Sequence, residues 1–87
     1  MIYGLDNLPR RLLVVDDDPA LLQMMCWTFS DMGYLVEAAA SCDEAIRLAS
    51  TQVFEFALVD YHLPDGNGLE LMERLSKQQP DLRSVHE

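Results

Sequence analysis

Aspartates follow two apolar runs, and their carboxylates could bind a divalent cation and a phosphoryl group. The run LLVV at 12–15 precedes three aspartates at 16–18, and the run FALV at 56–59 precedes Asp60. Uninterrupted apolar runs of this length are typical of strands buried on both faces of a parallel sheet. Ligands of open parallel sheets bind beyond the carboxyl ends of the strands. We therefore expect these carboxylates to meet at one rim of a sheet.

The predicted rim has the chemistry of a magnesium site. Mg²⁺ prefers oxygen ligands in near-octahedral geometry and is usually held by one or two carboxylates. Asp16, Asp17 and Asp60 could supply them, and a bound cation would relieve the repulsion between these carboxylates. An aspartate can also act as the nucleophile that forms an acyl phosphate. Asp18, directly before Pro19, is expected to be only a helix N-cap.

Length and charge narrow the classes of function. The chain has 87 residues, enough for one small domain, and its 15 acidic and 6 basic residues give a formal charge of -9. Direct binding to nucleic acid is disfavoured, because such sites are built from Lys and Arg, and binding to an acidic membrane surface is disfavoured for the same reason. With no signal-like or membrane-spanning segment, the prediction is a cytoplasmic protein.

Strand and helix patterns alternate along the chain. Helix starts are marked by Asp18-Pro19 and by a capping box from Ser41 to Glu44, and Gly33 marks a helix end. The patterns predict strands at 12–15, 34–38 and 54–59, alternating with helices at 19–32, 43–50 and 69–78. Residues 82–85 could begin a fourth strand. This alternation predicts an α/β protein with a parallel sheet and right-handed crossovers.

Two segments resemble the receiver domain of bacterial two-component response regulators. They are LLVVDDDP at 12–19 and LVDYHLPDGNGLEL at 58–71. The resemblance covers essentially the whole chain, residues 1–87, as one partial receiver domain. It implies a flavodoxin-like, three-layer α/β/α fold that is incomplete: about three βα units are present, and the last two strands and helices are missing.

The resemblance also assigns roles to individual residues. Asp60 matches the phosphoacceptor, which takes a phosphoryl group from a sensor histidine kinase or a phosphotransfer protein. Asp16 and Asp17 match the acidic pair that organises Mg²⁺, together with Asp60 and the backbone carbonyl of His62. Pro64 and Gly68 match the loop that shapes the site. By the resemblance the chain is a self-phosphorylating phosphoacceptor, not an enzyme acting on a separate substrate.

The chain departs from the family pattern at two functional positions. The family places a Ser or Thr at the end of its fourth strand and a Lys at the end of its fifth. The sole lysine, Lys77, falls on the predicted third helix, and Ser84 comes too early in the possible fourth strand. Loss of these groups would slow phosphorylation or make its product less stable, because phosphoryl charge would be less well neutralised.

Two other functions are consistent with parts of the pattern. A phosphorylation-incompetent pseudo-receiver, acting as an interaction or oligomerisation module, would explain the missing Lys but not the intact acids. A haloacid-dehalogenase-like phosphatase would need a general acid two residues after Asp60, where this chain has His62.

Incompleteness itself predicts self-association. In the family's strand order, 2-1-3-4-5, a chain that ended after its third helix would expose the third strand as an edge with unpaired backbone groups. The missing fifth helix would also uncover part of the first helix, with Leu22, Trp27 or Phe29 exposed. We therefore expect a homodimer or a higher assembly through the third-strand edge.

Overall fold

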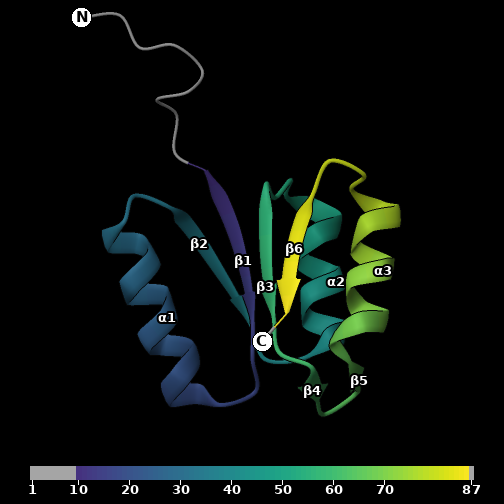
Figure 1. Ribbon diagram of the computed structural model, residues 1–87, viewed down its shortest axis with the longest axis horizontal. Coiled ribbons are helices and arrows are strands. Elements are labelled where there is room, and N and C mark those ends of the chain that lie inside the picture. Colours follow the sequence, from purple (N-terminus) through teal and green to yellow (C-terminus); the bar gives the residue numbers. More distant parts are fainter. Residues whose placement is uncertain (1–9, 87) are drawn as a thin grey trace, which may run out of the picture.

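Four parallel strands form the centre of the structure. The computed structural model describes residues 10–86 (Figure 1). The sheet order is β2-β1-β3-β6, and each strand pairs in parallel with its neighbours. The strands are β1 (Arg11–Val15), β2 (Leu35–Ala39), β3 (Phe56–Val59) and β6 (Arg83–His86). This is the strand order expected of a flavodoxin-like sheet that lacks its last strand.

Helices lie on both faces of the sheet. Figure 1 shows α1 (Pro19–Asp31) on one face and α2 (Cys42–Thr51) with α3 (Gly68–Gln78) on the other. The Asp18 side chain accepts hydrogen bonds from the first turn of α1, and the Ser41 hydroxyl accepts one from the Glu44 N–H, so both N-caps are confirmed. The capping box is formed only in part, because the Glu44 carboxylate accepts from the Ala40 N–H and not from Ser41. Parallel strands carry apolar residues on both sides because both faces must be covered.

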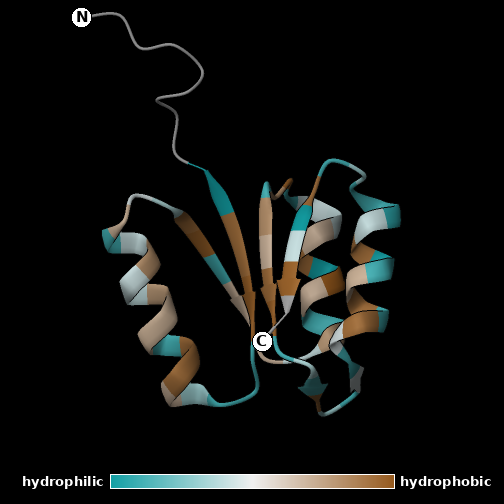
Figure 2. Cartoon of the chain, viewed as in Figure 1, coloured by the Kyte–Doolittle hydropathy of each residue, from teal (hydrophilic) through white to brown (hydrophobic). Residues whose placement is uncertain are grey.

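The core is divided by the sheet into two clusters. The larger lies under α2 and α3 and includes the fully buried residues Leu13, Val15 and Leu75. The smaller lies under α1 around Leu12, Val14 and Met25. Figure 2 shows hydrophobic residues along the strands and hydrophilic residues at the N-terminal ends of β1 and β6. The run at 12–15 is apolar at every position because alternate residues pack into the two clusters on opposite faces of the sheet.

The fourth strand corrects one prediction. β6 pairs with β3 over four residues, from Phe56↔Arg83 to Val59↔His86, so β3 is not an edge strand and β6 is. The prediction that the last two strands are missing was therefore wrong for one of them. The possible fourth strand predicted at 82–85 does form, over residues 83–86, because an edge strand needs few apolar residues to pair with its neighbour.

Element boundaries differ from the predicted ones by one or two residues. β2 begins at Leu35 and β3 at Phe56, and α2 extends from Cys42 to Thr51. The segment between β3 and α3, which holds the predicted loop residue Pro64, contains a short antiparallel hairpin formed by β4 (His62–Leu63) and β5 (Gly66–Asn67). Among residues 10–86, no helix has the length and apolar character needed to cross a membrane.

Gln79 joins three segments at the end of the sheet remote from the aspartates. Its Nε2 donates to the carbonyls of Ala49 and Gln52 at 2.9 and 2.7 Å, and its Oε1 accepts from the Phe54 N–H at 2.8 Å. The side chain therefore satisfies carbonyls at the end of α2 and the approach to β3, groups that helix termini leave unpaired.

Replacing this side chain should weaken the fold. We expect Gln79→Ala to lower the free energy of unfolding by roughly 2–3 kcal/mol, because three hydrogen bonds are lost and partly buried groups are left unpaired. Urea denaturation followed by circular dichroism measures the change. The neighbouring exposed glutamine provides the control, since Gln78→Ala should change stability little. Equal losses in both variants would contradict the bridging role.

Candidate functional site

The register of the sheet brings two strand ends together. Val15, the last residue of β1, pairs with Val59, the last residue of β3, so Asp16 and Asp60 leave neighbouring strands at the same level. The Asp60 N–H donates to the Val15 carbonyl at 2.9 Å. The Asp16 N–H donates to the Ala39 carbonyl of β2 at 3.0 Å. Backbone pairing thus continues one residue past the strands and fixes where both side chains begin.

Three carboxylates converge at this rim. Asp16, Asp17 and Asp60 each offer a carboxylate oxygen, and the three oxygens lie within 4.8 Å of one another. Asp16 is only 3% exposed, Asp60 is half-buried and Asp17 is exposed. The prediction that these carboxylates meet at one rim is confirmed. Asp18, at the same turn, is used as the cap of α1.

Burial and crowding make the Asp16 carboxylate harder to ionise. Loss of hydration raises its pKa above the ordinary value, and the nearby carboxylates of Asp60, Asp17 and Asp18 raise it further. A hydrogen bond from the Asp18 N–H to Asp16 Oδ1, at 2.9 Å, acts in the opposite direction. A buried carboxylate with negative neighbours is a position where a cation would be favourable.

The donor set fits a hard divalent cation. Three carboxylate oxygens from two strand ends are the ligands that Mg²⁺ and Ca²⁺ prefer, and among the side chains that the structure describes, no thiolate or imidazole is part of the cluster. One ligand is buried and one is exposed, so a cation held here would keep contact with solvent and with an incoming anion.

The segment after Asp60 turns back, so that Gly68 at the start of α3 lies close to the backbone of Asp60 and Tyr61. The Gly68 N–H donates to the Tyr61 carbonyl at 2.7 Å, which closes the loop over the β4–β5 hairpin. A Cβ on Gly68 would lie 2.5 Å from the Asp60 carbonyl oxygen, a backbone atom that cannot move aside easily. Glycine is therefore required for the start of α3 to approach Asp60.

The structure also places the other residues named from the sequence. His62 lies in β4, two residues after Asp60, with an exposed side chain whose ring is nearly perpendicular to the Tyr61 ring, 4.9 Å away between centroids. Lys77 lies on α3, as predicted, and its side chain is exposed. Ser84 pairs with Ala57, three residues before Asp60, so its hydroxyl lies short of the rim.

Asp65 is a site residue that the sequence reasoning missed. Its carboxylate accepts the backbone N–H groups of Cys42 at 2.8 Å and Asp43 at 2.9 Å. These donors belong to the first turn of α2, where backbone N–H groups have no partner within the helix. The signal was indirect: Pro64-Asp65-Gly66 marks a turn, but nothing local indicates that its acid caps a helix more than twenty residues away.

One family model matches almost the whole described chain. The model, described as the response regulator receiver domain, matches residues 12–86. Among curated proteins, the photosynthetic apparatus regulatory protein RegA of Cereibacter sphaeroides is 38% identical over 76 residues, covering 87% of this chain and 41% of RegA. The chain thus spans less than half the length of this relative.

Solved structures agree with the fold. A CheY-like receiver domain from Methanospirillum hungatei has a TM-score of 0.87 and 36% identity, covering 90% of this chain and 62% of that one. A response regulator from Burkholderia pseudomallei, solved with a phosphorylated aspartic acid, a calcium ion and citrate, has a TM-score of 0.84 and 36% identity. That alignment covers 88% of this chain and 45% of the other.

Stability should depend on the Asp65 carboxylate. Its hydrogen bonds with Asp43 and Cys42 hold its pKa below the ordinary 3.8, so the charged form is favoured in the folded state. The stabilisation of the fold by the charged Asp65 carboxylate is complete above pH 3.8, and it is lost as the pH falls through the lower pKa of Asp65 in the folded state. We expect Asp65→Asn to be less stable than the wild type at neutral pH, with the difference shrinking in acid.

Denaturant unfolding at several pH values measures this difference. Asp81→Asn is the control, because Asp81 is an exposed aspartate in the loop before β6. The same pH-dependent loss in Asp81→Asn would contradict a specific role for Asp65.

Proposed function

Because the chain belongs to the response regulator receiver domains, we propose that it is a phosphoacceptor in two-component signalling. In this proposal Asp60 receives a phosphoryl group from a phosphohistidine on a sensor histidine kinase or a phosphotransfer protein. The observation that carries it is the convergence of the Asp16, Asp17 and Asp60 carboxylates within 4.8 Å at the carboxyl ends of β1 and β3. A structural role alone would not require three acids to meet there.

The reacting atoms follow from the position of Asp60. A carboxylate oxygen of Asp60 attacks the phosphorus of the donor, an oxygen–phosphorus bond forms, and the phosphorus–nitrogen bond of the phosphohistidine breaks. The histidine nitrogen leaves with its electron pair, and Asp60 becomes an acyl phosphate. The half-buried position of Asp60 leaves its carboxylate open to a donor from outside the sheet.

Asp16, Asp17, Asp60 and the backbone carbonyl of His62 are the proposed ligands of Mg²⁺. When bound, the cation would offset the charge that these acids and a phosphoryl donor bring together. Asp16 is held in place by the hydrogen bond from the Asp18 N–H, and the close approach of Gly68 fixes the backbone after Asp60. The B. pseudomallei relative, with its phosphorylated aspartic acid and calcium ion, supports both parts of the proposal.

The proposed setting follows from the family. A receiver of this kind works in the cytoplasm as a phosphoacceptor and changes its association with a partner or an output domain, without turning over a separate substrate. The large excess of acidic over basic residues disfavours direct contact with nucleic acid.

Phosphorylation can be tested with a small-molecule donor. Incubation with acetyl phosphate and Mg²⁺ should add one phosphoryl group to the intact mass, and Asp60→Asn should gain none. The adduct should be unstable in alkali or hydroxylamine, because it is an acyl phosphate. No adduct in a sample shown by circular dichroism to be folded would favour the pseudo-receiver function instead.

Cation binding can be tested separately from phosphorylation. Mg²⁺ at about a hundred times its dissociation constant should stabilise the fold by about 2.7 kcal/mol, measured by denaturant unfolding. Asp17→Asn, which changes an exposed ligand without disturbing the core, should remove most of this gain. Asp81→Asn, at the opposite end of the sheet, should keep it. A gain that survives in Asp17→Asn would contradict the proposed site.

A further inference from the structure

The start of α2 connects the two sides of the aspartate rim. The Ala39 carbonyl, at the end of β2, accepts the Asp16 N–H at 3.0 Å, and α2 begins three residues later at Cys42. The first two backbone N–H groups of α2 donate to the Asp65 carboxylate at 2.8 and 2.9 Å. Asp65 lies in the turn between β4 and β5, the hairpin that follows Asp60 (Figure 1). A continuous series of contacts therefore runs from Asp16 through α2 to this hairpin.

The β4–β5 hairpin needs contacts outside itself. Two residues of β4 pair with two of β5, and an isolated hairpin is at best marginally stable in water. Leu63 is buried in the core cluster under α2 and α3. Gly66 lies so close to α2 that a Cβ there would be 3.2 Å from Cys42 Sγ. The Asp65 carboxylate adds a directional attachment, because two charge-assisted hydrogen bonds fix both distance and orientation.

α2 has an N-cap of its own. The Ser41 hydroxyl accepts the Glu44 N–H at 3.2 Å, and the Ser41 carbonyl accepts the Ala45 N–H at 3.1 Å. Asp65 binds the two remaining donors of the first turn from a segment more than twenty residues away. The acid therefore ties two segments together, in addition to satisfying the end of a helix.

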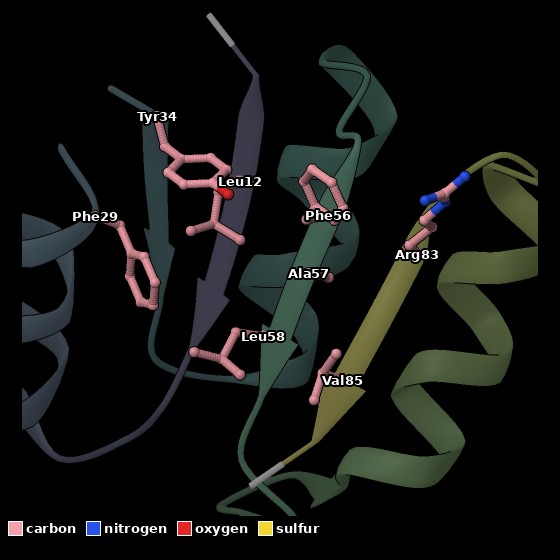
Figure 3. Close-up of a pocket in the computed structure, with 8 residues that line it drawn as sticks. All are labelled: Leu12, Phe29, Tyr34, Phe56, Ala57, Leu58, Arg83 and Val85. Atoms are coloured by element: carbon pink, nitrogen blue, oxygen red, sulfur yellow. The ribbon is translucent and has the colours of Figure 1, made fainter. Parts of the chain in front are cut away.

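The face of the sheet that carries α1 has no comparable attachment among the described residues. There, the side-chain hydrogen bonds of α1 stay within the helix and its N-cap. Figure 3 shows apolar side chains on that face, among them Leu12, Phe29 and Leu58. Hydrophobic contacts are not directional, so the directional contacts that hold the hairpin lie on the side of α2.

We propose that Asp65 is a positioning residue for the cation at the rim. By holding the hairpin against α2, it keeps the backbone carbonyl of His62 beside the carboxylates of Asp16 and Asp60. This inference rests on the proposed function, in which that carbonyl and both carboxylates are ligands. Contacts that orient metal ligands without touching the metal contribute strongly to affinity. Because such coupling is reciprocal, a bound cation must also strengthen the bonds between Asp65 and α2.

The magnesium affinity of the intact 87-residue chain tests this role. Titration calorimetry should give a dissociation constant about tenfold higher for Asp65→Ala than for the wild type. Asp65→Asn should lose less affinity, because its amide oxygen can still accept one of the two N–H groups. Circular dichroism of each variant checks that it is folded.

Two control variants separate positioning from charge and from stability. Asp43→Asn removes an exposed carboxylate from the first turn of α2 but keeps the backbone N–H that donates to Asp65. Gln79→Ala weakens the fold at the end of the sheet remote from the rim. Each should change the dissociation constant of Mg²⁺ much less than Asp65→Ala does.

Hydrogen exchange of the wild type supplies a second readout. Saturating Mg²⁺ should slow exchange of the Cys42 and Asp43 N–H groups about tenfold more than exchange of the Gln52 N–H at the other end of α2. If Asp65→Ala does not fold, this measurement and the affinity of Asp65→Asn decide.

The outcomes distinguish the positioning role from the proposed function. A wild-type chain that binds no Mg²⁺ would overturn both. Binding by the wild type with no loss in the Asp65 variants, an equal loss in Asp43→Asn or Gln79→Ala, or equal slowing of exchange at both ends of α2 would overturn the positioning role alone.

Discussion

Parallel pairing of β1 with β3 is the constraint on which the rest of the structure depends. Once Val15 lies opposite Val59, Asp16 and Asp60 must leave the sheet side by side, whatever their mutual repulsion. The backbone bonds of both aspartates to the adjacent strands leave little freedom to separate. Packing of the two apolar runs therefore holds negative charges close together, and burial, with these negative neighbours as a smaller cause, raises the pKa of Asp16.

The segments around the rim maintain the same arrangement by hydrogen bonds that carry no catalytic chemistry. The β4–β5 hairpin is attached to α2 through the Asp65 carboxylate and to the backbone at Asp60 through the close contact of Gly68. At the far end of the sheet, Gln79 performs the corresponding task for α2 and β3. Both side chains supply partners for helix ends, where backbone groups would otherwise be unpaired. The position of the site thus depends on these peripheral contacts as well as on packing within the core.

Local patterns were sufficient to predict the parts of the fold that local forces decide. The buried runs at 12–15 and 56–59, the caps of α1 and α2, and the meeting of the three acids follow from periodicity, capping and strand direction. Asp65 and Gln79 were missed because their partners lie more than twenty residues away, and the identity of an Asp or Gln does not reveal a distant partner. β6 was predicted only as the possible beginning of a strand at 82–85, for a different reason: an edge strand is formed by backbone pairing with β3, and its side chains need not show the pattern of a buried strand.

Basic and acidic side chains lie at opposite ends of the strands, and this separation affects how a phosphoryl group would be held at the rim. Three of the six basic residues, Arg10, Arg11 and Arg83, lie at the N-terminal ends of strands, and the sole lysine lies on the outside of α3. A phosphoryl group on Asp60 would therefore face Asp16 and Asp17 without a basic side chain from these residues beside it. In that setting the proposed cation at the rim and the proposed phosphoryl group on Asp60 would favour each other, and thermodynamic linkage would make the effect reciprocal. The acids that make phosphorylation unfavourable in isolation are the same groups that would couple it to the cation.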